Sequence, residues 1–219
     1  MSTYVLIHGA GSDSFSWHWV TPLLEELGHD VVAPDLPCDD ESADLDDYAD
    51  VVVDAIGGRS GLVVVGQSLG GMTAPLVCAR VPAELLVMVA AMVPAPGEAP
   101  GDWWQNTGWN RTGVGEFDPL VDFFNGVPDD VVSEVFSHPQ KAQAGRPFEK
   151  PWSLDAWPDV PTRFLLCRDD RFFPAEFQRR VVRDRLGIVP DEMDGGHLPA
   201  FGRPRELVDR LESYRASLG

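Results

Sequence analysis

Short apolar runs alternate with segments of helical periodicity over most of the chain. Apolar runs of strand length occupy residues 5–7, 31–33, 62–65, 85–91 and 164–167, and a shorter candidate lies at 191–193. Helical patterns occupy residues 14–27, 44–56, 69–80, 174–186 and 206–217. Continuous apolar strands that alternate with helices are typical of a parallel sheet buried on both faces. The pattern therefore predicts an α/β fold with a mostly parallel sheet and helices on both faces.

Residues 94–160 interrupt this alternation. The stretch from Pro94 to Pro161 holds ten prolines and five of the seven tryptophans of the chain, and no clean strand pattern is visible in it. Large aromatic side chains are normally buried, so a segment this aromatic is not a linker. We expect it to fold against the rest of the protein.

Composition narrows the class of protein. The chain has 219 residues, 44% of them hydrophobic, with 17 basic and 35 acidic residues and a net charge of −18. This length and apolar fraction predict one folded domain. The acidic charge argues against binding to nucleic acid or to an anionic membrane surface. The longest apolar run, residues 85–93, is too short to span a bilayer, and the N-terminus lacks the pattern of a signal peptide. We therefore expect a cytoplasmic protein.

The spacings of the cysteines and histidines predict neither a disulfide bond nor a metal site. The three cysteines, Cys38, Cys78 and Cys167, are far apart and form no CxxC pair, so neither a disulfide framework nor a zinc site is predicted. No two histidines have the spacing of metal ligands. We expect no metal and no cofactor.

The clearest chemical signal lies after the third predicted strand. The sequence Gly66-Gln67-Ser68-Leu69-Gly70 reads G-x-S-x-G between an apolar run and a helical pattern, which is the context of a nucleophile elbow. The sharp turn raises the serine oxygen above the sheet, and the following helix N-terminus presents N–H groups to developing negative charge. We predict that Ser68 is a nucleophile.

A serine nucleophile needs a base, and the base needs an orienting group. Among five histidines, His197 fits the base best because it follows two glycines in a loop before the last predicted helix. Asp169 and Asp170 follow the strand at 164–167 and compete for the role of orienting acid. The order serine, aspartate, histidine is the one found along α/β-hydrolase chains.

With these motifs in place, the chain resembles the α/β-hydrolase superfamily nearly from end to end. Within it, the chain is most similar to the plant methylesterase and hydroxynitrile lyase group. The narrower resemblance is carried by Leu6-Ile7-His8-Gly9-Ala10, Ser16-Trp17, residues 28–36 and residues 174–178. The abbreviated start of the chain implies a sheet of about six strands. Leu198 stands where hydroxynitrile lyases of this type carry a lysine, which argues against that lyase activity.

The resemblance implies a catalytic triad. Ser68 is the implied nucleophile, His197 the general base and then acid, and Asp170 the orienting carboxylate. Asp170 is preferred to Asp169 because it lies four residues before Pro174, as the acid of the family typically does.

The resemblance also implies an oxyanion hole and a cap. The backbone N–H groups of Ala10 and Leu69 are the implied oxyanion donors. Residues 94–160 fall where this fold inserts its cap, with residues 1–93 and 161–219 as the core. The side chains expected to face the substrate pocket are Phe15, Trp17, His18, Trp103 and Trp104. Four phenylalanines of the cap are expected to help roof it: Phe117, Phe123, Phe124 and Phe136.

The predicted function is hydrolysis of an ester-type bond in a small or medium apolar substrate beneath the cap, through an acyl-enzyme. Two alternatives stay open. The same triad could serve a lyase, cyclase or thioesterase step in small-molecule metabolism, or the chain could be a ligand receptor with weak catalysis. We expect a monomer or a homodimer. The dimer would join the acidic residues 44–54 of one copy to arginines of another: Arg179, Arg180, Arg183 and Arg185.

Overall fold

The computed structural model describes residues 1–109 and 116–218. Its six strands form one parallel sheet in the order β2-β1-β3-β4-β5-β6. The strands are β1 (Thr3–Ile7), β2 (Asp30–Val32), β3 (Leu62–Gln67), β4 (Ala83–Val89), β5 (Thr162–Cys167) and β6 (Asp191–Met193). The predicted parallel sheet of about six strands is confirmed.

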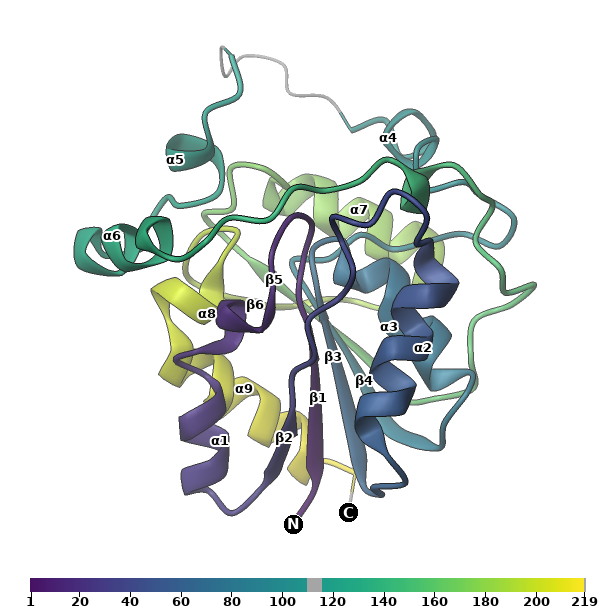
Figure 1. Cartoon of the computed structure of the whole chain (residues 1–219), viewed down its shortest axis with the longest axis horizontal. Helices are drawn as coiled ribbons and strands as arrows, with labels where there is room; N and C mark the ends of the chain where they lie inside the picture. Colours follow the sequence, from purple (N-terminus) through teal and green to yellow (C-terminus); the bar gives the residue numbers. More distant parts are fainter. Residues whose placement is uncertain (110–115, 219) are drawn as a thin grey trace.

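Helices cover both faces of the sheet (Figure 1). On one face lie α2 (Leu45–Ile56), α3 (Gly70–Cys78) and α7 (Ala175–Leu186), and on the other lie α1 (Thr21–Glu26) and α9 (Pro204–Ala216). Alternate strand residues face the two layers, so that Val64 packs in the first core and Val63 and Val65 in the second. The four inner strands, β1, β3, β4 and β5, are therefore apolar on both sides over most of their length, whereas the short edge strands β2 and β6 are partly exposed.

Local sequence signals account for several helix boundaries. Asp44 caps α2 in a reciprocal capping box with Asp47, and α2 ends at Gly57 in the left-handed conformation. The predicted helix at 14–27 is divided into a 3-10 turn, η1 (Ser14–Trp17), and α1, which has a proline in its first turn. A short helix that the periodicity does not reveal, α8 (Pro199–Gly202), precedes α9.

The segment between β4 and β5 carries short elements above the carboxyl ends of the strands (Figure 1). They are α4 (Trp103–Asn106), α5 (Pro119–Asp122), α6 (Asp129–Ser137) and η2 (Arg146–Phe148). Several hydrogen bonds join this segment to the core; for example, the Ala144 N–H donates to the carbonyl of Cys38 at 2.7 Å, and the Trp152 indole N–H to that of Met72 at 2.9 Å. In the described residues no helix has the length and apolarity to cross a bilayer.

All four arginines expected at a dimer contact have partners within the chain. Arg180 donates to the carbonyl of Thr107 at 2.6 Å, and Arg183 lies 3.5 Å from the carboxylate of Asp184. Arg185 forms an ion pair with the largely buried Glu98, with nitrogen–oxygen distances of 2.5 and 2.6 Å. Burial by itself would raise the pKa of Glu98, but its hydrogen bonds outweigh that effect and lower the pKa. Arg179 pairs with Glu176 and Glu192. The homodimer through these arginines stays a prediction.

Candidate active site

Ser68 lies at the turn between β3 and α3, in a strained backbone conformation. Its φ is +52°, in the left-handed region that residues other than glycine rarely occupy. The turn is tight enough that a Cβ on Gly66 would lie 2.6 Å from the carbonyl oxygen of Gly70, and a Cβ on Gly70 2.6 Å from that of Ile7. The two glycines of G-x-S-x-G are thus required by space, and the strand-to-helix turn predicted from the motif is observed.

Ser68, His197 and Asp170 form a continuous hydrogen-bonded chain. His197 Nε2 lies 3.0 Å from Ser68 Oγ, and His197 Nδ1 lies 2.9 Å from Asp170 Oδ2. The other carboxylate oxygen accepts the backbone N–H groups of Phe172 and Phe173 at 2.9 and 2.8 Å. Because the carboxylate accepts at Nδ1, the Nδ1 atom carries the imidazole proton and Nε2 is left to accept from the serine hydroxyl.

The neighbouring Asp169 makes different contacts from Asp170. One of its carboxylate oxygens accepts the N–H of Gly195 at 3.1 Å, and its backbone carbonyl accepts from the side chain of Asn125 at 2.8 Å. Asp169 therefore contacts the glycine loop that carries His197, and of the two aspartates it is Asp170 that contacts the imidazole. The carbonyl of His197 also accepts from the Gln67 amide at 3.0 Å, which ties this loop to the serine turn.

The loop after β1 passes directly beside Ser68. A Cβ on Gly9 would lie 3.1 Å from the Ser68 Cβ. The buried His8 has Nδ1 2.8 Å from the carbonyl of Gly9, and its Nε2 accepts the N–H of Leu36 at 3.0 Å. This contact at Nε2 places the proton on Nδ1, and burial lowers the pKa of His8, so the ring is neutral. His8 thereby fixes the loop that carries Ala10.

Ala10 and Leu69 supply the two backbone N–H groups expected to form an oxyanion hole. Leu69 follows Ser68 and occupies the N-cap position of α3, and Ala10 lies on the wall of the cavity at Ser68. Within the described residues, neither N–H donates a hydrogen bond to another backbone or side-chain group. Both donors are therefore available to a ligand, as an oxyanion hole requires.

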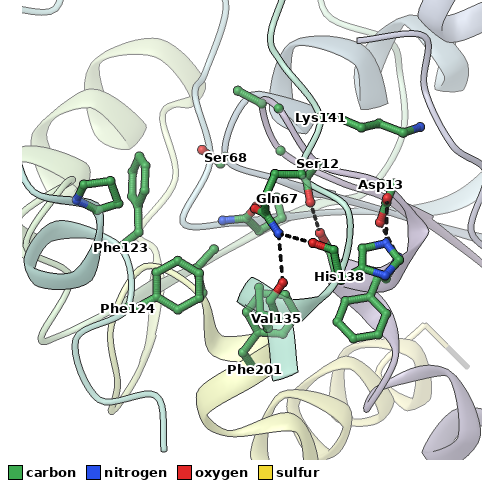
Figure 2. Close-up of a pocket in the computed structure, with 18 of the residues that line it drawn as sticks. Ser12, Asp13, Gln67, Ser68, Phe123, Phe124, Val135, His138, Lys141 and Phe201 are labelled. Atoms are coloured by element: carbon green, nitrogen blue, oxygen red, sulfur yellow. Dashed lines mark hydrogen bonds and ion pairs between the residues drawn. The ribbon is translucent and has the colours of Figure 1, made fainter. Parts of the chain in front are cut away.

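A cavity of about 310 Å³ opens at Ser68 and His197, between the core and the segment above it (Figure 2). Its size lies at the lower end of the range for small-molecule sites. Its apolar wall is made by Phe15, Pro119, Phe123, Phe124, Val135, Phe136, Leu198 and Phe201. Figure 2 shows Phe123 and Phe124 on one side of Ser68, and Asp13 and His138 on the other. His138 Nε2 lies 3.0 Å from Asp13 Oδ2 at this more polar side.

Of the five residues expected in the pocket, only Phe15 lines this cavity within the described residues. Trp17 is 1% exposed and packs in the core beneath α1 and α9. His18 stacks on Phe15 from outside and faces a separate surface hollow. Trp103 donates its indole N–H to the carbonyl of Val93 at 2.9 Å in the other core layer. Contrary to the expectation, these three residues do not line the cavity: core packing takes up the rings of Trp17 and Trp103, and His18 is exposed on the outer side of Phe15.

Trp104 does not line the cavity either, and of the four phenylalanines expected to roof the pocket Phe117 is absent from its wall. Trp104 packs edge-on against Trp103 and Trp109 instead of lining the cavity. Phe123, Phe124 and Phe136 lie in the cavity wall as expected. The polar lining residues that were missed include Ser12, Asp13, His138, Gln140 and Lys141, and no sequence motif marks these five. In residues 1–109 and 116–218, no group of His, Cys, Asp or Glu side chains could hold a metal ion.

A parallel sheet with a serine at a strand-to-helix turn, met by an aspartate and a histidine in that chain order, defines the α/β-hydrolase class. The chain belongs to the Alpha/beta hydrolase family, whose model matches residues 4–210. The family predicted from the sequence is thus confirmed.

Similar proteins include members of the plant methylesterase group. Methylesterase 1 of Arabidopsis thaliana is 25% identical over 94% of this chain and 93% of its own length. Salicylic acid-binding protein 2 of Nicotiana tabacum is 26% identical over 95% of each chain. The crystal structure of polyneuridine aldehyde esterase matches with a TM-score of 0.81 at 20% identity, covering 98% of this chain and 99% of that one. At this level of identity, the match to the crystal structure shows a shared fold.

Proposed function

We propose that this protein hydrolyses carboxylic esters of small or medium apolar substrates, with Ser68 as nucleophile and an acyl-enzyme as intermediate. The observation that carries the proposal is the hydrogen-bonded chain from Asp170 through His197 to Ser68, which ends at an apolar cavity. The esterases among the similar proteins support the same type of reaction.

In the first half of the proposed reaction, Ser68 Oγ attacks the ester carbonyl carbon while His197 Nε2 takes the hydroxyl proton. Asp170 stabilises the imidazolium that forms. The negative oxygen of the tetrahedral intermediate accepts the N–H groups of Ala10 and Leu69. His197 then returns the proton to the alcohol, which leaves, and the acyl group stays on Ser68.

In the second half, a water molecule takes the place of the alcohol. His197 removes its proton, the hydroxide attacks the acyl carbon, and the same two N–H groups hold the second oxyanion. Collapse of this intermediate breaks the bond to Ser68, and His197 returns the proton to Oγ. The products are the free acid and the restored serine.

The cavity supports an apolar substrate of limited size. Its wall is largely formed by phenylalanine, proline, valine and leucine side chains near Ser68. Burying apolar surface there stabilises a bound substrate by about 25 cal/mol per Å² of area removed from water. The more polar side of the cavity, at Asp13 and His138, offers hydrogen-bonding groups that can orient a polar substituent.

Substitution of the nucleophile tests the proposal. Ser68→Ala is expected to abolish turnover of p-nitrophenyl butyrate and labelling by a fluorophosphonate probe, while the control Ser217→Ala, at the end of α9, keeps both. Hydrolysis in ¹⁸O-labelled water should place the label in the butyrate released. Retained turnover in Ser68→Ala, or acid without label, would refute the proposal. The label also separates hydrolysis from a lyase or cyclase reaction, because neither of those incorporates water into an acid.

A further inference from the structure

Both peptide planes that flank the Cα of Ala10 are held by a side chain. The first plane contains the Gly9 carbonyl and the Ala10 N–H, and His8 contacts that carbonyl at 2.8 Å. The second contains the Gly11 N–H, which donates to Gln143 Oε1 at 3.1 Å. Because a trans peptide is planar, fixing one of its polar groups fixes the direction of the other. The direction of the Ala10 N–H is thus set directly by His8. Gln143 fixes the next plane, which is joined to the first at the Ala10 Cα, and so restricts how far the Ala10 N–H can turn.

The orientation of the Gln143 amide follows from its other contacts. Its Nε2 donates to the carbonyl of Ala144 at 3.0 Å and to the hydroxyl of Tyr48 on α2 at 3.2 Å. A carbonyl can only accept a hydrogen bond, so the nitrogen of the amide must face Ala144 and the oxygen must face Gly11. All polar groups of this half-buried side chain have partners, and none is left for a substrate.

The chain around Gln143 also packs closely on the loop. Gly11 has φ +59°, and a Cβ there would lie 3.2 Å from the carbonyl oxygen of Lys141. Residues 36–38 complete the contact: the Cys38 carbonyl accepts the Ala144 N–H at 2.7 Å, and the Cys38 thiol donates to the carbonyl of Ser12 at 3.2 Å. Three segments distant in sequence therefore meet at the loop of Ala10, and Gln143 is the side chain of the cap segment that bonds to that loop's backbone.

We propose that Gln143 is a positioning residue of the oxyanion hole, through which the segment above the sheet restricts rotation of the chain at Ala10 and so keeps the Ala10 N–H directed at the site. This inference rests on the proposed function. The oxyanion forms only after Ser68 attacks, so misdirecting one donor weakens the transition state more than the bound ester. Loss of the Gln143 contact should therefore lower kcat and leave KM nearly unchanged.

The test uses Gln143→Met, which keeps the length of the side chain and removes the amide. With p-nitrophenyl butyrate we expect kcat to fall about 10–100-fold, since small misplacements of reacting groups cost up to about that factor, and KM to change less than about two-fold. Butylboronic acid, which forms a tetrahedral adduct with a serine oxygen, should bind more weakly by a similar factor. Butyrate, the product, should bind as before.

A matched control removes another hydrogen bond to α2 from the same segment. Ser153 Oγ donates to Asp46 Oδ1 at 2.9 Å, and Ser153→Ala should leave kcat and both inhibition constants unchanged. Should Gln143→Met fail to fold, Gln143→Ala removes the same acceptor without adding atoms and gives the same test. An unchanged kcat, or equal weakening of butyrate and butylboronic acid, would overturn the inference. Turnover that survives Ser68→Ala would instead overturn the proposed function, so the two failures are distinguishable.

Discussion

Phe123, on the segment above the sheet, stacks on the imidazole of His197, with ring centroids 5.2 Å apart and planes inclined by 27°. The rings of Phe172 and Phe173 approach the same imidazole edge-on, each at 5.2 Å. The proposed base is therefore enclosed by three aromatic rings and is 1% exposed. An aromatic face attracts a cation, so the stacked ring should stabilise the imidazolium of the transition state more than the neutral imidazole of the resting site.

Removing that ring should slow the chemical step. A cation–π contact at a partly enclosed site contributes about 1 kcal/mol, so Phe123→Leu is expected to lower kcat roughly five-fold. Leucine still covers the imidazole and fills the cavity wall, so KM should change little. Phe123→Tyr keeps an aromatic face and serves as the matched control. Steady-state kinetics with p-nitrophenyl butyrate measure both constants, and equal kcat values for the two variants would exclude a role for the aromatic face.

Replacement of the acid should act through the histidine tautomer. In Asp170→Asn the amide oxygen can still accept from the N–H groups of Phe172 and Phe173, while its NH₂ group faces His197 Nδ1. Nδ1 must then accept a hydrogen bond, and the imidazole proton moves to Nε2. A protonated Nε2 cannot take the proton of Ser68. We expect kcat to fall by about 10³–10⁴-fold, as in a serine triad that loses its carboxylate.

The neighbouring aspartate provides the control for that experiment. Asp169→Asn can still accept the N–H of Gly195, so its kcat should fall less than about ten-fold. Thermal unfolding followed by circular dichroism checks that both variants keep the fold. A larger loss in Asp169→Asn than in Asp170→Asn would contradict the assignment of the orienting acid.

The sequence contains the information for the sheet and for the serine turn, because both depend on residues adjacent in the chain. The apolar runs of the four inner strands are buried on both faces, and G-x-S-x-G marks a turn that only small residues can flank. Asp169 and Asp170 are harder to separate, since both follow β5 directly. Their difference arises from contacts with Gly195 and His197, which lie more than twenty positions away along the chain.

The pocket could not be predicted residue by residue. Aromatic character indicates that a side chain is buried, but not whether it faces a cavity or the core. Trp103 is buried beside Phe173 and Phe177, whereas Phe123 faces Ser68 and His197. Such a difference depends on how the segment between β4 and β5 folds over the sheet, and that segment has neither the regular period nor the motifs of the core.

Away from the active site, Glu212 joins α9 to the first strand. Its carboxylate receives two hydrogen bonds from Arg215, at 2.9 and 2.8 Å, and one from the hydroxyl of Tyr4 in β1. His29 Nε2 lies 3.2 Å from the same carboxylate, and His29 Nδ1 accepts the N–H of Ser2 at 3.1 Å. The hydrogen bonds from Arg215 are the main cause that lowers the pKa of Glu212 from 4.5 to about 2.

This lowered pKa predicts how stability depends on pH. A carboxyl group whose pKa is lower in the folded state stabilises it fully above the unfolded value of 4.5, and this contribution is lost as the pH falls toward about 2. Glu212→Gln should therefore reduce the free energy of unfolding by about 1–2 kcal/mol at neutral pH, the scale of a charged hydrogen bond that is partly exposed. Between about pH 4.5 and pH 2 the difference from the wild type should shrink steadily. Urea unfolding at several pH values measures it, with the exposed Glu25→Gln on α1 as control, and a difference that stays constant with pH would show that Glu212 acts by packing alone.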